Sequence, residues 1–199
     1  MIEIEMAMKP DALSSTVKKA AAFFRSKETA EISREMFQFL LNPIKENLYN
    51  FILKSLYFSE DADDVYQDTV LRAFKYKNTY DENRSFKTWL FTIAHNEIKR
   101  YFNKTKKVPD TLAPAANLSS AHDTGDKTLV QDIYEIAGQL NPNRRKVFFL
   151  FYDQRFSIQE ISQITGLKQG NIKFILNQAR EKIKQKLGFK GGQNDGYNK

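Results

Sequence analysis

Basic, aromatic and amide side chains are concentrated in residues 81–107 of this sequence, DENRSFKTWLFTIAHNEIKRYFNKTKK. Residues 84–107 carry seven basic side chains and one acid, Glu97, which gives this stretch a net charge of +6. Positive side chains neutralise a phosphate backbone, and aromatic or amide groups can hold exposed bases. The chemistry indicated is the binding of single-stranded or opened DNA. An ordinary solvated helix face carries similar charge, so periodicity and charge alone leave both interpretations open.

A second cluster, residues 59–68, contains five acids and no base: Glu60, Asp61, Asp63, Asp64 and Asp68. Such acids are typical of a Mg²⁺ site, of a helix start where they complement the helix dipole, or of a surface that docks a basic partner. Ser59 is a suitable N-cap for the helix. On a helix these acids point in several directions, and no second carboxylate motif completes a metal site. We therefore favour capping and docking, and expect no metal and no cofactor.

The bulk composition narrows the class of protein. The chain has 199 residues, a net charge of +7 and a pI near 9.4, which favours an anionic partner such as nucleic acid or a membrane surface. Disulfides and thiolate metal sites are excluded because there is no cysteine, and the two histidines, His95 and His122, leave little for triad chemistry. No apolar run has the length of a membrane span and the N-terminus lacks a signal-peptide pattern, so we expect a cytoplasmic protein.

Helical periodicity predicts the element that positions the basic cluster. One apolar stripe spans it and is formed by Phe86, Trp89, Leu90, Ile93, Ala94, Ile98 and Tyr101. We expect Trp89 to lie in the core rather than on DNA. The opposite face carries Thr92, His95, Asn96, Lys99, Arg100 and Asn103. Glycine and proline are few and lie mostly between periodic segments, which favours an all-α chain.

More helices are predicted before this one. Apolar residues recur at helical spacing over residues 36–56, and the Asn42-Pro43 pair is expected to bend or divide this stripe because proline lacks a backbone donor. A further helix follows the acidic cluster, with a buried face formed by Val65, Val70, Leu71 and Phe74. Three or more helices are therefore expected to pack over residues 33–103.

The C-terminal part has a different organisation. Residues 105–127 lose all periodicity and have the composition of a linker. Beyond them, Asn141-Pro142 predicts a helix start, and Ser157 with Glu160 forms a capping box. A short helix, a turn at Gly166 and a longer helix then give the helix-turn-helix pattern, although a helical hairpin that does not bind DNA can show it too. Residues 168–190 carry a net charge of +6, and a recognition helix enters the major groove by its N-terminal residues.

In their order and spacing, these motifs resemble the extracytoplasmic-function (ECF) type of bacterial RNA polymerase sigma factor over about residues 33–187. DADDVYQDTVLRAF resembles the family's acidic helix, YDENRSFKTWLFTIAHNEIKRYF its tryptophan-containing block, and LNPNRRKVFFLFYDQRFSIQEISQITGLKQGNIKFILNQAREKIKQKL its helix-turn-helix block. The resemblance implies an all-α fold of two small helical domains joined by a flexible linker. The implied parts are an N-terminal extension (1–32), sigma region 2 (33–104), the linker (105–127), sigma region 4 (128–190) and a disordered tail (191–199).

The resemblance also implies partners and site residues. The partners are core RNA polymerase, through its β′ clamp helices and β flap, promoter DNA and an anti-sigma factor. The family's acidic helix binds the clamp helices, and the matching positions are Asp64, Gln67, Asp68 and Leu71. The family's second block faces the −10 element and captures a flipped non-template base. The matching positions are Tyr80, Asn83, Phe86, Asn96, Lys99, Arg100 and Lys104.

The helix-turn-helix block implies recognition of the −35 element, but here the sequence departs from the family. Phe174 and Ile175 replace the usual Ser-Arg pair and Gln178 replaces an arginine, so fewer bidentate guanine contacts are expected. Phe174 is interpreted as a contact to a thymine methyl, to an inhibitory partner or to an extra helix. The DNA contacts are then expected from Lys168, Gln169, Asn171, Lys173, Phe174, Asn177 and Arg180.

The leading interpretation is a non-enzymatic initiation subunit that directs core polymerase to promoters. A stand-alone helix-turn-helix regulator would need neither the acidic helix nor the tryptophan-containing block. Two further alternatives are a metal-dependent nuclease using Asp61, Asp63 and Asp64, and a degenerate sigma-like protein that binds polymerase without promoter recognition.

Overall fold

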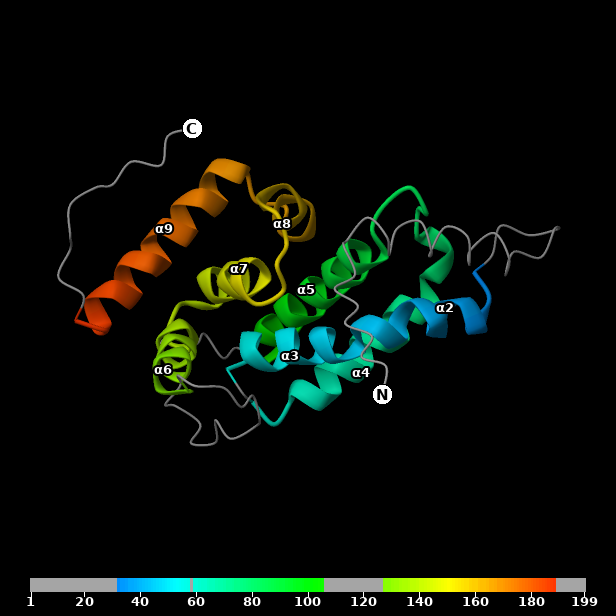
Figure 1. The fold of residues 1–199 in the computed structure, drawn as a ribbon. Coiled ribbons are helices and arrows are strands. Elements are labelled where there is room, and N and C mark those ends of the chain that lie inside the picture. Colours follow the sequence, from blue (N-terminus) through cyan, green and yellow to red (C-terminus); the bar gives the residue numbers. More distant parts are fainter. Residues whose placement is uncertain (1–31, 58, 106–126, 189–199) are drawn as a thin grey trace, which may run out of the picture.

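The computed structural model describes residues 32–57, 59–105 and 127–188, which form helices, turns and loops and no strand (Figure 1). The first half contains α2 (Arg34–Leu41), the 3-10 helix η1 (Asn42–Ile44), α3 (Lys45–Ser55), α4 (Ala62–Lys75), η2 (Lys77–Thr79) and α5 (Phe86–Thr105). The second contains α6 (Lys127–Gly138), α7 (Pro142–Tyr152), α8 (Ile158–Thr165) and α9 (Gln169–Lys186). The all-α prediction is confirmed, whereas the predictions for residues 1–31, 106–126 and 189–199 lie outside the described residues.

Local signals set most helix boundaries of the first half. The Ser33 hydroxyl accepts a hydrogen bond from the Met36 amide at 3.1 Å and caps α2, and Pro43 lies in the 3-10 turn that separates α2 from α3, as predicted. The prediction for Ser59 is wrong, because α4 begins at Ala62 with Asp61 in the N-cap position. The Ser59 hydroxyl instead donates to the Asp61 carboxylate at 3.1 Å, within the turn before the helix.

The predicted buried face of α4 is partly wrong. Leu71 is 68% exposed and Phe74 is 38% exposed, whereas the side chains that α4 buries are Ala62, Val65, Thr69 and Ala73. Three of these four are small or hydroxylated, which fits a helix that packs closely against both α3 and α5. The buried Thr69 hydroxyl has a hydrogen-bond partner, because it donates to the Val65 carbonyl at 2.7 Å. The larger apolar side chains are therefore left outside this contact.

Helix α7 is buried on almost every side. It packs against α3 of the first half and against α6, α8 and α9 of the second. Even Arg145 and Lys146 are buried, which apolar periodicity did not predict. The Arg145 guanidinium donates to the Leu140 carbonyl at 3.0 Å and to the Ser55 carbonyl of α3 at 3.3 Å, and it lies over the Tyr57 ring. A buried charge needs such partners, and here they come from both halves.

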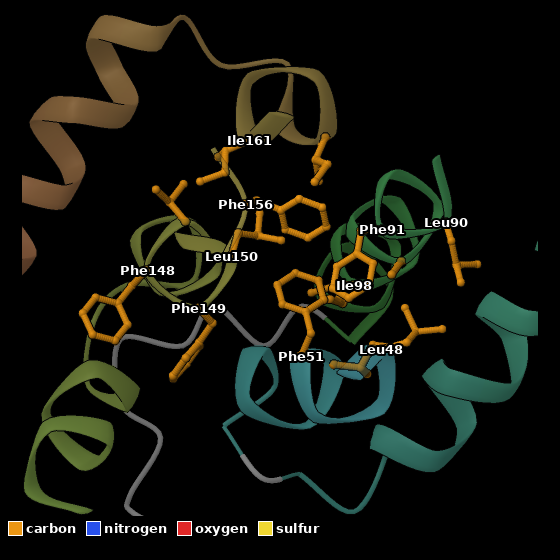
Figure 2. Packing of buried hydrophobic residues seen from close by; sticks show 14 of the residues in the cluster. Leu48, Phe51, Leu90, Phe91, Ile98, Phe148, Phe149, Leu150, Phe156 and Ile161 are labelled. Atoms are coloured by element: carbon orange, nitrogen blue, oxygen red, sulfur yellow. The ribbon is translucent and has the colours of Figure 1, made fainter. Parts of the chain in front are cut away.

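The two halves share one continuous apolar core. Helix α3 packs on α7 and α5 packs on α8. Figure 2 shows the rings of Phe51, Phe91 and Phe156 converging between helices of the two halves, with the Phe91 and Phe156 centroids 5.0 Å apart. The sequence predicts two domains but does not reveal that they pack together.

Polar contacts surround this apolar junction. The Lys54 ammonium of α3 lies 2.5 Å from the Asp153 carboxylate, which also accepts a hydrogen bond from the Tyr134 hydroxyl at 2.9 Å. The Lys87 ammonium of α5 donates to the Gln154 carbonyl at 2.8 Å and lies over the Phe156 ring. Because the Lys54 and Lys87 contacts each join one half to the other, the relative position of α5 and the helix-turn-helix is defined by side chains as well as by apolar burial.

Candidate nucleic-acid and protein interfaces

The outer face of α4 presents the four residues that match the polymerase-binding helix. Asp64, Gln67, Asp68 and Leu71 are all exposed and are separated by three or four residues, which places them on one side of an α-helix. Two carboxylates and an amide thus flank an apolar side chain. We call these four residues the α4 face; it combines negative charge with one exposed apolar side chain, Leu71, at its C-terminal end.

Two of the remaining acids of residues 59–68, Asp61 and Asp63, have other partners. The Asp61 carboxylate accepts a hydrogen bond from the Tyr101 hydroxyl of α5, and a hydrogen bond between Tyr49 of α3 and Asp63 raises the pKa of that tyrosine. These acids therefore tie α4 to its neighbours. Within the residues that the structure describes, no group of three His, Asp or Glu side chains is arranged to hold a metal ion.

The loop before α5 is ordered by short-range hydrogen bonds. The Asp81 carboxylate accepts hydrogen bonds from the backbone amide and the side-chain amide of Asn83, both at 3.0 Å. The Tyr80 hydroxyl donates to the Arg84 carbonyl at 2.9 Å, and burial raises the pKa of Tyr80 to about 12, with Glu82 and Asp81 adding to the effect. Asn83 itself is exposed. The loop is therefore ordered, with the Asn83 side chain exposed and the Tyr80 ring held in place by its hydroxyl.

The Tyr80 ring belongs to a cluster of three aromatic side chains. Tyr80, Phe86 and Trp89 contact one another with centroids 5.2–5.6 Å apart. Trp89 is half-buried and packs against the core, as expected. Phe86 is only 6% exposed and also meets Phe37 of α2, so the structure places it beneath the loop rather than at its surface.

The outer face of α5 is basic. Asn96, Lys99, Arg100 and Lys104 are exposed and succeed one another at helical spacing. Beneath them Glu97 is buried, with the Arg72 guanidinium of α4 2.5 Å away and the Arg100 guanidinium 3.4 Å away. The geometry of the Arg72 contact makes an ion pair without an aligned hydrogen bond. One buried acid therefore joins helix α4 to the basic face of α5.

His95 does not lie on the open polar face that periodicity predicts. Burial lowers its pKa to about 4, with further contributions from Lys146 of α7 and Lys99. Lys146 is buried too, and burial together with Lys99 lowers its pKa to about 8. The sequence does not reveal this site, because a helix period gives the direction of a side chain but not which element covers it.

The helix-turn-helix has the local geometry that the sequence predicts. Ser157 and Glu160 form the capping box at the start of α8, and Gly166 closes the helix in the left-handed conformation with φ of 73°. The Ser162 hydroxyl donates to the Leu167 carbonyl at 2.7 Å and fixes the turn. Helix α9 then packs on α8 through buried side chains, including Ile161 and Ile172.

The exposed face of α9 contains every residue expected at the −35 element. Exposed side chains are Lys168, Gln169, Asn171, Lys173, Phe174, Asn177 and Arg180. The Arg180 guanidinium donates to the side-chain carbonyl of Asn177 and to the Leu176 carbonyl. Phe174 is 59% exposed, the largest exposed apolar side chain of this helix.

Comparisons with known proteins agree with this arrangement. The sequence matches the family descriptions Sigma-70 region 2 over residues 42–108 and Sigma-70, region 4 over residues 131–183. It is 26% identical over 154 residues to the ECF RNA polymerase sigma factor SigM of Bacillus subtilis (strain 168), covering 75% of this chain and 91% of SigM. It is also 26% identical over 180 residues to SigW of the same strain, covering 82% of this chain and 95% of SigW.

A solved structure supports the fold. The sigma factor RpoE, in complex with the anti-sigma factor NepR from Bartonella quintana, superposes with a TM-score of 0.65 at 22% identity, over 78% of this chain and 98% of RpoE. The helix order and the matches to both regions define a bacterial transcription-initiation protein of the sigma-70 class. Within that class, the chain belongs to the ECF-type sigma factors.

Proposed function

We propose that this sigma factor directs core RNA polymerase to a set of promoters by using three surfaces: the α4 face, the loop with the basic face of α5, and the exposed face of α9. The observation that carries the proposal is that the α4 face and the seven α9 candidates are solvent-exposed even though the two halves pack together. The chain acts in the cytoplasm as a binding subunit and has no turnover of its own. None of the described helices is long and apolar enough to cross a bilayer.

The α4 face docks on the β′ clamp helices of the polymerase. Exposed carboxylates complement a basic partner and speed up encounter, while an exposed leucine gains apolar burial. Leu71 supplies that apolar contact, and Asp64, Gln67 and Asp68 lie in the two turns before it. In the same proposal, region 4 contacts the β flap.

The loop and α5 open the −10 element. An unpaired base can be stacked on an aromatic side chain and hydrogen-bonded on its Watson–Crick edge by an amide. Asn83 and Asn96 supply amides, and Tyr80 supplies a ring that packs edge to face against Phe86. Lys99, Arg100 and Lys104 contact phosphates and offset the cost of melting.

Helix α9 reads the −35 element in the major groove. No side chain caps its N-terminus at Lys168, so this helix end is open to a phosphate. An anti-sigma factor is a further expected partner, since the RpoE structure holds one. It would compete with polymerase or with DNA for the same surfaces.

Run-off transcription tests the proposal. Purified bacterial core polymerase is incubated with promoter fragments from the protein's own genome, with and without this chain, and we expect protein-dependent transcripts from a subset of fragments. The double variant Gln67→Ala/Asp68→Ala should lower polymerase affinity at least tenfold in a fluorescence binding assay. Glu46→Ala removes another exposed acid, on α3, and is the matched control.

Two results would contradict the proposal. Polymerase binding without any transcript supports the degenerate sigma-like alternative. DNA binding without polymerase binding supports a stand-alone regulator. Equal polymerase affinity of the double variant and the wild type would remove the α4 face from the proposal.

A further inference from the structure

The exposed face of α9 is centred on an aromatic side chain. Ile172, Leu176 and Ala179 are buried and define the inner side of the helix. Phe174 lies about 200° around the helix from Ile172, at roughly 100° per residue, and is 59% exposed. It therefore points away from α8, in the direction from which the major groove would be approached.

One turn before Phe174, the same face carries Gly170. A Cβ added at Gly170 would meet no atom within 4 Å, and the φ angle is not positive, so neither packing nor backbone conformation requires glycine here. Glycine inside a helix is destabilising relative to alanine. Gly170 and Phe174 are four residues apart and therefore share one face of α9, and no atom lies within 4 Å of the Cβ position at Gly170. Phe174 thus has open space one turn before it on the outer face of the helix.

The residues around Phe174 indicate what kind of ligand this side chain would contact. A buried aromatic side chain contributes about 150–250 Å², whereas a stable protein interface needs about 800 Å² from each partner. The exposed neighbours of Phe174 are polar or basic, including Asn171, Lys173 and Asn177. One isolated ring among positive charges suits a small apolar group on a polyanion. In the major groove, the apolar group at a base edge is the 5-methyl of thymine.

We propose that Phe174 reads the 5-methyl group of one thymine in the −35 element, and that Gly170, which has no side chain, leaves room for this group one turn earlier on the same face. This inference rests on the proposed function, because it assigns a base preference to the recognition helix of the sigma factor. Phe174 is a specificity-determining residue, and Gly170 provides room for the methyl group. The methyl contact replaces part of the guanine recognition for which this helix lacks arginines.

The test uses holoenzyme and measures the effect of a single methyl group. Promoters with a randomised −35 region are selected for binding to core polymerase carrying this chain. Each thymidine of the selected element is then replaced singly by deoxyuridine, which removes only the methyl. Transfer of one methyl group to an apolar site corresponds to a factor of about three to ten in affinity. We expect one such replacement to lower wild-type affinity by that factor.

Variants at α9 distinguish methyl recognition from general DNA binding. Phe174→Ala should bind the thymidine promoter more weakly and should bind the thymidine and deoxyuridine promoters equally, whereas Phe174→Leu should keep part of the preference. Lys173→Ala should weaken both promoters by the same factor, as loss of a phosphate contact does. Gly170→Ala should lower the thymidine preference although alanine favours the helix.

Each outcome decides the inference. A wild-type holoenzyme that binds every deoxyuridine promoter as tightly as its parent overturns it, and so does a Phe174→Ala variant that keeps the wild-type preference. In both cases the selected promoters still show that the protein is an active sigma factor. If no promoter is selected and no transcript is formed, the proposed function fails and the inference fails with it.

Discussion

At the scale of single residues, His95 has an unusual environment. Its imidazole Nδ1 is buried and has no hydrogen-bond partner among the described residues, and the charged groups that lower its pKa are Lys146 and Lys99. No acid appears among the causes of its shift. The site therefore accepts neutral imidazole and opposes its protonation.

This environment predicts an acid-sensitive stability. The pKa of His95 is about 4 in the folded chain against 6.5 as the ordinary value, so between these pH values the unfolded chain binds the extra proton. The free energy of unfolding should therefore fall as the pH decreases from 6.5 to 4, by up to about 3 kcal/mol from this residue. Urea denaturation at several pH values measures the fall, and His95→Gln should remove this part of it.

The other histidine provides the control. His122→Gln changes the same residue type elsewhere in the chain. Identical pH profiles of the wild type and His95→Gln would show that His95 is not the group that titrates. An equal change in both variants would show that the effect is not specific to the buried site.

The exposure of individual side chains was predictable where the helix that covers or leaves them open belongs to the same half of the chain. The outward positions of α9 follow from the helix period and from the apolar residues that face α8. The period also places Phe86 in the apolar stripe, and this residue is buried and meets Phe37 of α2. For Lys146 the period was not enough, because packing between the two halves buries it. Such burial depends on packing partners that are distant in the sequence.

At the scale of helices, one buried acid pairs with charges on both α4 and α5. Glu97 is 4% exposed and neutralises both Arg72 and Arg100. Removing one partner of a buried pair leaves the other charges uncompensated. We expect Glu97→Gln to lower the free energy of unfolding by about 2 kcal/mol, less than for a fully buried pair because both arginines reach solvent. Urea denaturation at pH 7 measures it.

A surface acid serves as the comparison for Glu97. Glu181 lies 3.5 Å from Lys184 on the exposed side of α9. Because exposed pairs contribute little, Glu181→Gln should change stability by less than about 0.5 kcal/mol. Similar losses in the two variants would contradict the assignment of Glu97 as the acid that holds the helices together.

Helix boundaries were largely predictable because capping chemistry is local. Pro43, Asn141 and the capping box of α8 mark element ends as predicted. Ser59 failed as a signal because Asp61, two residues later, occupies the N-cap position. The buried face of α4 failed because close packing between helices favours small side chains, while hydrophobicity alone favours Leu71 and Phe74.

At the scale of the whole molecule, the two halves lie side by side, with α5 in contact with α8 (Figure 1). Elements at −10 and −35 are about 25 base pairs apart, roughly 85 Å of straight B-DNA at about 3.4 Å per step. With α5 packed on α8 and α8 packed on α9, the DNA-binding surfaces of α5 and α9 cannot both reach their elements across that distance. The chain between Thr105 and Lys127 reaches at most about 75 Å when extended, which permits separation. We therefore expect the halves to separate on a promoter.

Energy transfer between two dyes tests this separation. The chain has no cysteine, so Asn50→Cys on α3 and Gln163→Cys on α8 provide two exposed labelling sites. We expect high transfer efficiency in the free chain and low efficiency in holoenzyme on a promoter. Unchanged efficiency on the promoter would show that the halves stay together.

Gly138 offers a way to weaken the contact directly. A Cβ at this position would overlap the ring of Tyr57, which is buried against Arg145. Gly138→Ala should therefore lower the transfer efficiency of the free chain. Gly170→Ala, whose Cβ meets open space, is the matched glycine control and should leave it unchanged.

The contact between the halves also determines when the protein occupies DNA. If the closed arrangement is favoured by about 2.7 kcal/mol, about one free chain in a hundred is open, and promoter affinity is about a hundredfold weaker than that of the open form. Polymerase that holds the halves apart removes this difference. Idle copies would then stay off the chromosome, and transcription would follow the number of assembled holoenzymes rather than the total amount of sigma factor in the cell.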